Sequence, residues 1–103
     1  MPFKNKDKPE WFVQWQNKFY SSKVWKDKVE EIKRRDGLVS AYSHKGIKTR
    51  VIVDHIIEIT PQNYQNMDIV LGNDNLQLLS EEEHNYKHYD IKAINEDEYE
   101  DPY

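Results

Sequence analysis

Residues 52–88 read IVDHIIEITPQNYQNMDIVLGNDNLQLLSEEEHNYKH and hold three of the four histidines of the chain. A β-branched apolar run near the start of this stretch ends in an Asp-His pair, and a second short apolar run follows an asparagine. The stretch closes on two histidines that are four residues apart. The polar positions in question are Asp54, His55, Asn75, His84 and His88. The rest of the chain is best understood as support for this block.

Three segments have the composition of strands. Residues 38–43 and 50–55 are separated by a turn over residues 43–46, and the second of them alternates apolar side chains as a half-buried strand does. Residues 75–79 form the third. Between the last two strands, proline, glycine and asparagine punctuate residues 58–74, which predicts an irregular loop.

Two helices are predicted before these strands. Residues 11–20 are dense in aromatic side chains, which we interpret as a short helix whose aromatic side packs onto the domain; base or ligand stacking is the alternative. Residues 23–35 follow Ser21-Ser22, which offers a candidate N-cap, and precede Gly37, a candidate C-cap glycine. One apolar stripe at helical spacing runs along this second helix, through Trp25, Val29 and Ile32.

A third helix is predicted to begin after Ser80. Ser80 and Glu83 have the spacing of a capping box, and the helix is expected to end near residue 93. The sequence therefore predicts one α+β domain over residues 21–93, preceded by a basic and aromatic arm over residues 1–20. Residues 94–103 form an acidic tail with almost no aliphatic side chains.

The charge of the chain is distributed unevenly. Residues 1–50 carry 13 lysines and arginines against 6 acidic residues, whereas residues 51–103 carry 2 against 13. This asymmetry favours a basic face for nucleic acid with an acidic tail. The chain has no cysteine, which excludes disulfides and thiolate zinc sites. No apolar run approaches the ~20 residues that span a bilayer, so we expect a cytoplasmic protein without a membrane partner.

The histidines and Asp54 suggest a metal site. His84 and His88 fall on one side of the same helix, as two ligands of one ion must, although a histidine pair without a role is about as common. One carboxylate and two imidazoles leave coordination positions open, which is typical of catalytic metal sites. His55 could then deprotonate a water molecule, and Asn75 could hold the loop that orients it. These residue types are consistent with a one-metal phosphodiester hydrolase.

The order of these residues resembles the HNH endonuclease family. The likeness lies in Asp54-His55-Ile56-Ile57, then Asp74-Asn75-Leu76-Gln77-Leu78-Leu79, then His84-Asn85-Tyr86-Lys87-His88. The approach Phe19-Tyr20-Ser21-Ser22-Lys23-Val24-Trp25, before a helix ending in Arg35-Asp36-Gly37, resembles the small phage-encoded members.

The resemblance implies a ββα-metal fold that binds one divalent ion, which could be Mg²⁺, Mn²⁺, Ni²⁺ or Zn²⁺. It places the general base on His55, the supporting asparagine on Asn75, and the metal ligands on Asp54, His84 and His88. DNA would be the substrate. Some phage members of the family act beside the terminase, so the resemblance also implies DNA-packaging proteins as candidate partners. A phage-encoded protein would be located in the cytoplasm of the host cell.

One feature departs from the family. Many phage members carry two Cys-x-x-Cys pairs that hold a structural zinc, whereas the matching positions here are Ser40, Ser43, Ser80 and Glu83. We therefore expect no structural zinc. The departure also leaves a second hypothesis open, in which the fold serves as a DNA-binding or protein-binding regulatory module without catalysis.

The basic residues of the first half are the candidate phosphate contacts. These are Lys33, Arg34, Arg35, Lys45, Lys48 and Arg50. The first three also suit the last turn of a helix, where cations interact favourably with the helix dipole, and the sequence alone does not choose between the two roles.

Overall fold

The structure, a computed structural model, describes the backbone of residues 8–94 and the side chains of residues 8–88. The first lysines of the predicted arm and residues 95–103 of the predicted acidic tail lie outside these described residues. The elements in chain order are α1 (Glu10–Tyr20), α2 (Lys23–Asp36), β1 (Val51–His55), α3 (Met67–Val70), a 3₁₀ turn η2 (Asn73–Asn75), β2 (Leu76–Ser80) and α4 (Glu81–Ile94).

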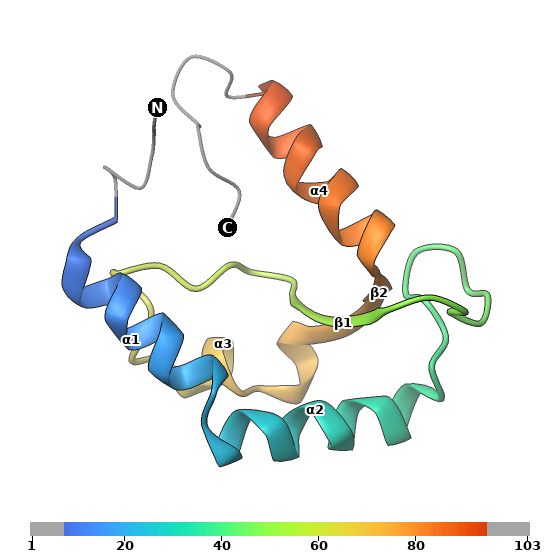
Figure 1. Cartoon of the computed structure of the whole chain (residues 1–103), viewed down its shortest axis with the longest axis horizontal. Coiled ribbons are helices and arrows are strands. Elements are labelled where there is room, and N and C mark those ends of the chain that lie inside the picture. The colour runs from blue at the N-terminus through green and yellow to red at the C-terminus, as the bar shows by residue number, and fades with distance from the viewer. Residues whose placement is uncertain (1–7, 95–103) are drawn as a thin grey trace.

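The centre of the fold is a two-stranded antiparallel ribbon. β1 pairs with β2 in a register that runs from Val51 opposite Ser80 to His55 opposite Leu76. In Figure 1 the ribbon lies between α2 and α4, and α4 continues directly from the end of β2. The predicted α+β architecture, with two strands around a loop followed by a helix, is confirmed.

The helix over residues 23–35 is confirmed together with both of its caps. The Ser22 hydroxyl accepts a hydrogen bond from the Trp25 amide, and Gly37 adopts φ 66°, the left-handed conformation that glycine tolerates at a helix end. Trp25 and Ile32 are buried against Leu78 of β2. The predicted apolar stripe of α2 therefore packs onto the ribbon and forms one half of the core.

The aromatic segment over residues 11–20 is helical, as predicted, and contributes the second half of the core. Phe12 is fully buried and packs with Ile59 and Val70 from the long loop. Trp15 stacks on Phe19 with ring centroids 5.1 Å apart. Aromatic side chains thus provide the apolar area that a chain with 37% hydrophobic residues otherwise lacks.

The predicted strand over residues 38–43 is wrong. A single bridge joins Val39 to Gly46, and Leu38 and His44 have φ of 60° and 62°, a left-handed conformation that ends extended structure. The hydroxyl of Ser40 accepts hydrogen bonds from the backbone amides of Tyr42 and Ser43, so the segment curls into a compact turn. The Ser40 hydroxyl thus takes backbone donors that a strand would use for pairing, which is why the apolar pattern wrongly indicated a strand.

The irregular loop over residues 58–74 was also predicted incompletely, because it contains α3 and η2. Asn66 caps α3 by accepting the Asp68 amide at 3.0 Å. Gly72 lies so close to the Asp68 carbonyl that a Cβ atom would collide with it. These local contacts give the loop a fixed shape beneath the end of β1.

The compact turn at Ser40 is joined to the start of α4 by hydrogen bonds. The Ser40 hydroxyl donates to Glu83 Oε1 at 2.7 Å, and the capping box is formed, with Ser80 and Glu83 each accepting the other's backbone amide. Three of the four positions that the resemblance matches to zinc-binding cysteines, Ser40, Ser80 and Glu83, are thus joined here by hydrogen bonds. This cluster anchors α4 at the angle that carries its histidines over β1.

None of the helices within residues 8–94 has both the length and the apolar character needed to cross a lipid bilayer.

Candidate metal centre

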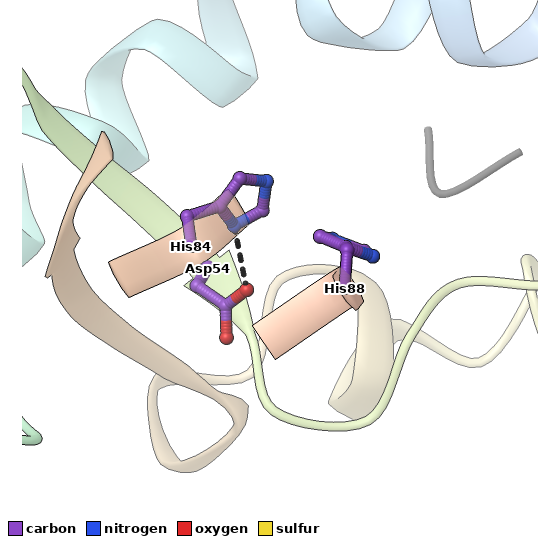
Figure 2. Close-up of side chains that lie close together, drawn as sticks. All are labelled: Asp54, His84 and His88. Atoms are coloured by element: carbon purple, nitrogen blue, oxygen red, sulfur yellow. Dashed lines mark hydrogen bonds and ion pairs between the residues drawn. The ribbon is translucent and has the colours of Figure 1, made fainter. Parts of the chain in front are cut away.

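Asp54, His84 and His88 lie close together, as Figure 2 shows. Asp54 comes from β1, and the two histidines come from successive turns of α4. His84 Nδ1 is 3.0 Å from Asp54 Oδ1, and the two imidazole rings have centroids 4.6 Å apart. One candidate ligand atom from each residue lies within 4.8 Å of the others.

The geometry and chemistry of this group fit a divalent cation. Without an ion, His84 Nδ1 and Asp54 Oδ1 share a hydrogen bond at 3.0 Å; an ion that replaced this proton would find the two atoms about as far apart as two ligands at about 2.1 Å and at right angles. Burial, together with neighbouring His84, lowers the pKa of His88 to about 4, so its imidazole is neutral at pH 7, the form that binds metals.

Asp54 is a buried carboxylate, with 3% of its surface exposed. Its Oδ2 atom accepts hydrogen bonds from Gln77 Nε2 at 2.9 Å and from Lys87 Nζ at 2.7 Å. Burial alone would raise the pKa of Asp54, but hydrogen bonds from His84 and Lys87 outweigh it and lower that pKa. The site therefore holds a carboxylate anion at neutral pH, ready to bind a cation.

His55 follows Asp54 in β1 and is packed on the other side of the strand. Its ring stacks on Trp25 with centroids 5.1 Å apart and an angle of 17° between the planes. His55 Nε2 lies 2.9 Å from the Val70 carbonyl, which can only accept, so Nε2 carries the proton and Nδ1 is left as the acceptor. Burial lowers the pKa of His55, which favours this neutral form.

Asn75 ties down the chain immediately after His55. Its side-chain oxygen accepts the Ile57 amide at 2.8 Å, and its side-chain nitrogen donates to the carbonyls of Ile57 and Ile69. Its backbone carbonyl also accepts the Ile56 amide. Asn75 therefore contacts the segment that follows His55 through both its side chain and its backbone.

One cavity of about 670 Å³ joins these groups. Both sides of β1 contribute to its lining, so the candidate metal ligands and His55 open into the same space. The polar residues around it are Lys8, Gln16, Asn17, Tyr20, Asp54, His55, Glu58, His84, Lys87 and His88. α1 forms the wall opposite α4, a role that its aromatic composition did not reveal.

Sequence reasoning missed Gln77 and Lys87, the two donors to Asp54. Lys87 lies three residues after His84 on the same helix, so its position among the helical ligands was visible in the sequence. Gln77 stands directly opposite Asp54 in the strand pair. That relation follows only from the register of the ribbon, which the sequence does not specify.

The six predicted phosphate contacts lie outside the cavity lining. Arg35 donates to the carbonyls of Asn73 and Leu76 and pairs with Asp36, so its guanidinium joins α2 to β2. These contacts engage the donors of Arg35 within the protein, which makes Arg35 the weakest of the six candidate phosphate contacts. Two more of the six form ion pairs at the surface, Lys33 with Glu30 and Arg50 with Glu81. The remaining three, Arg34, Lys45 and Lys48, are exposed.

Comparison with known proteins identifies one curated relative that supports a family assignment. The chain is 32% identical over 74 residues to the "Probable HNH endonuclease" of Lactococcus phage SK1, a match that covers 72% of this chain and 79% of the relative. No family model matches the chain, and no solved structure gives a significant match. With its β1–β2–α4 unit and the Asp54, His84 and His88 cluster, the chain belongs to the HNH endonuclease family.

Proposed function

We propose that this protein is a metal-dependent endonuclease that hydrolyses phosphodiester bonds of DNA. The observation that carries the proposal is the position of Asp54, His84 and His88, with ligand atoms within 4.8 Å, in the same cavity as His55. A phage relative named as a probable HNH endonuclease supports the same activity.

His55 is the proposed general base. Its Nε2 proton is fixed by the Val70 carbonyl, so Nδ1 can accept a proton from a water molecule as that water attacks phosphorus. Stacking on Trp25 restricts the plane of the ring, and Asn75 restricts the chain that follows it. A base that is already oriented loses little entropy in the reaction.

Asp54, His84 and His88 are the proposed ligands of the divalent ion. When bound, such an ion supplies Lewis-acid stabilisation of the negative charge that develops on the phosphate and the leaving oxygen. Two imidazoles suit Ni²⁺ and Zn²⁺ more than Mg²⁺, which prefers oxygen ligands. We therefore expect the tightest binding with the first two ions, and Mn²⁺ between them and Mg²⁺.

Phosphates that flank the cleaved bond would be bound by exposed lysines and arginines. Of the residues predicted from the sequence, we retain Lys33, Arg34, Lys45, Lys48 and Arg50. We give Arg35 less weight, because its guanidinium is engaged by Asp36 and by two backbone carbonyls. Lys8 and Lys87 line the cavity itself and bring positive charge closer to the proposed scissile phosphate.

A non-catalytic regulatory module is the competing function. The cluster argues against it, because a module that only binds DNA does not require a buried carboxylate faced by two imidazoles. Burying a carboxylate is costly unless it is paired or coordinates a metal. The buried Asp54 carboxylate faces His84 at the wall of the cavity.

Cleavage of supercoiled plasmid tests the proposal. Protein freed of metal by a chelator is expected to leave the plasmid intact, and adding Mn²⁺, Ni²⁺, Zn²⁺ or Mg²⁺ separately is expected to restore nicking or linearisation with at least one ion. Activity that persists without any divalent ion would contradict metal dependence. No cleavage with all four ions, by protein shown to bind metal, would favour the regulatory module.

A further inference from the structure

The Asp54 carboxylate is held by groups from both other parts of the ββα unit. Gln77, its cross-strand partner on β2, donates to Oδ2, and so does Lys87 on α4. The other oxygen, Oδ1, faces His84. The two oxygens of one buried carboxylate therefore have different surroundings, one filled by protein donors and one turned toward the histidines.

We propose that Gln77 and Lys87 are positioning residues that hold Asp54 with Oδ1 toward the divalent ion. The inference rests on the proposed metal site and adds two residues to it. We call this pair of donors the Asp54 clamp. It would act on the ion only through Asp54, without contacting the ion.

The clamp has an effect because the χ2 torsion of an aspartate, which turns the carboxylate, has only a weak preference of its own. The terminal torsion of an aspartate is broad and roughly two-fold, so a carboxylate without fixed partners turns easily. Two donors within 3 Å of one oxygen distinguish Oδ2 from Oδ1 and favour one orientation. Outer partners of metal ligands generally act in this way, and their loss costs about 10–100-fold in metal affinity or activity.

Lys87 makes a second contact that Gln77 does not. Its ammonium also donates to the His55 carbonyl at 3.0 Å, and its side chain is only 17% exposed. One lysine thus joins α4 both to the proposed metal ligand and to the backbone of the proposed base. These two contacts attach α4 to the end of β1 where the proposed ligand and the proposed base lie.

The two clamp residues should differ in their effect on metal affinity. The Lys87 ammonium repels a nearby cation, so its positioning effect and its charge act in opposite directions. Gln77 carries no charge, so a variant without its amide loses the positioning effect and no charge effect. Gln77 is therefore the residue on which the proposal is tested most cleanly.

The first experiment measures divalent-ion affinity of the full chain by titration calorimetry with Ni²⁺ and Zn²⁺. Gln77→Leu is expected to bind about 10–100-fold more weakly than the unaltered protein, with a similar melting temperature, because leucine suits a strand. Gln65→Leu, at an exposed loop position outside the cavity lining, is the matched control and should bind as the unaltered protein does. Equal affinity of Gln77→Leu and the control would overturn the clamp.

The second experiment uses Co²⁺ as a spectroscopic probe with the pair Lys87→Arg and Lys87→Met. Lys87→Arg keeps the charge and a donor, so the visible spectrum of its Co²⁺ complex should stay close to that of the unaltered protein. Lys87→Met loses both, and its Co²⁺ bands should shift. Identical spectra for all three proteins would contradict a positioning role for Lys87. If the unaltered protein binds no divalent ion, the proposed function fails and the clamp with it; if it binds ions but the variants match it, only the clamp fails.

Discussion

Alanine in place of His55 is expected to lower DNA cleavage by about 10²–10⁴-fold, the usual contribution of a general base. Divalent-ion affinity should change little, because His55 faces Trp25 while the proposed metal ligands face one another across β1 and α4. The loss should appear in the rate of single-turnover cleavage at saturating metal and DNA, with little change in DNA affinity.

Because His55 is buried against Trp25, its removal also leaves a cavity that could destabilise the fold. His55→Asn fills part of that space and serves as the second variant, and melting temperatures of both should be measured. A folded variant of either kind that binds metal and cleaves at the unaltered rate would remove His55 as the base.

Alanine in place of His88 is expected to weaken divalent-ion binding by on the order of 100-fold or more, since losing a ligand should cost more than losing an outer partner. His88 is 8% exposed and one helical turn from His84, so alanine at this position leaves Asp54 and His84 as the remaining members of the cluster. Cleavage should fall at low metal concentration and recover in part as the ion concentration rises.

Calorimetry of His88→Ala measures this effect, with His44→Asn as the control. His44 lies in an exposed turn at φ 62°, a conformation that asparagine tolerates better than alanine, so the control variant introduces little strain. Unchanged affinity in His88→Ala would exclude His88 from the ligand set and leave Asp54 and His84 without their third partner.

Much of the fold was predictable because its signals are local. The caps at Ser22 and Gly37 mark α2, and the capping box of Ser80 with Glu83 marks α4 within about one residue of its observed bounds. The i, i+4 spacing of His84 and His88 likewise follows from helix geometry alone. Each of these features depends on residues a few positions apart, which a single sequence records.

The features that were not predicted depend on contacts between distant segments. Residues 38–43 have the apolar pattern of a strand, but the hydroxyl of Ser40 takes up backbone amides and links the turn to Glu83, 43 positions away in the sequence. The charge of Arg35 marks it as a candidate phosphate contact, whereas its hydrogen bonds to the carbonyls of Asn73 and Leu76 join residues 38 and 41 positions apart. Long-range partners of this kind are set by tertiary packing, which overrides local pattern.

The same limit applies to the site. Asp54, His84 and His88 were grouped from the sequence because their residue types suit a metal, and the structure brings them together. Gln77 has no such type-based signal, since its importance comes only from standing opposite Asp54 in the register of β1 and β2. The residues that orient a ligand are therefore harder to predict than the ligands.

The most direct measurement is anomalous X-ray scattering from crystals of the protein grown with Mn²⁺. We predict one strong peak bounded by Asp54 Oδ1 and the imidazoles of His84 and His88, in the cavity that His55 lines. A Mn²⁺ peak elsewhere on the chain, with none between these three side chains, would contradict the metal centre on which the proposed nuclease depends.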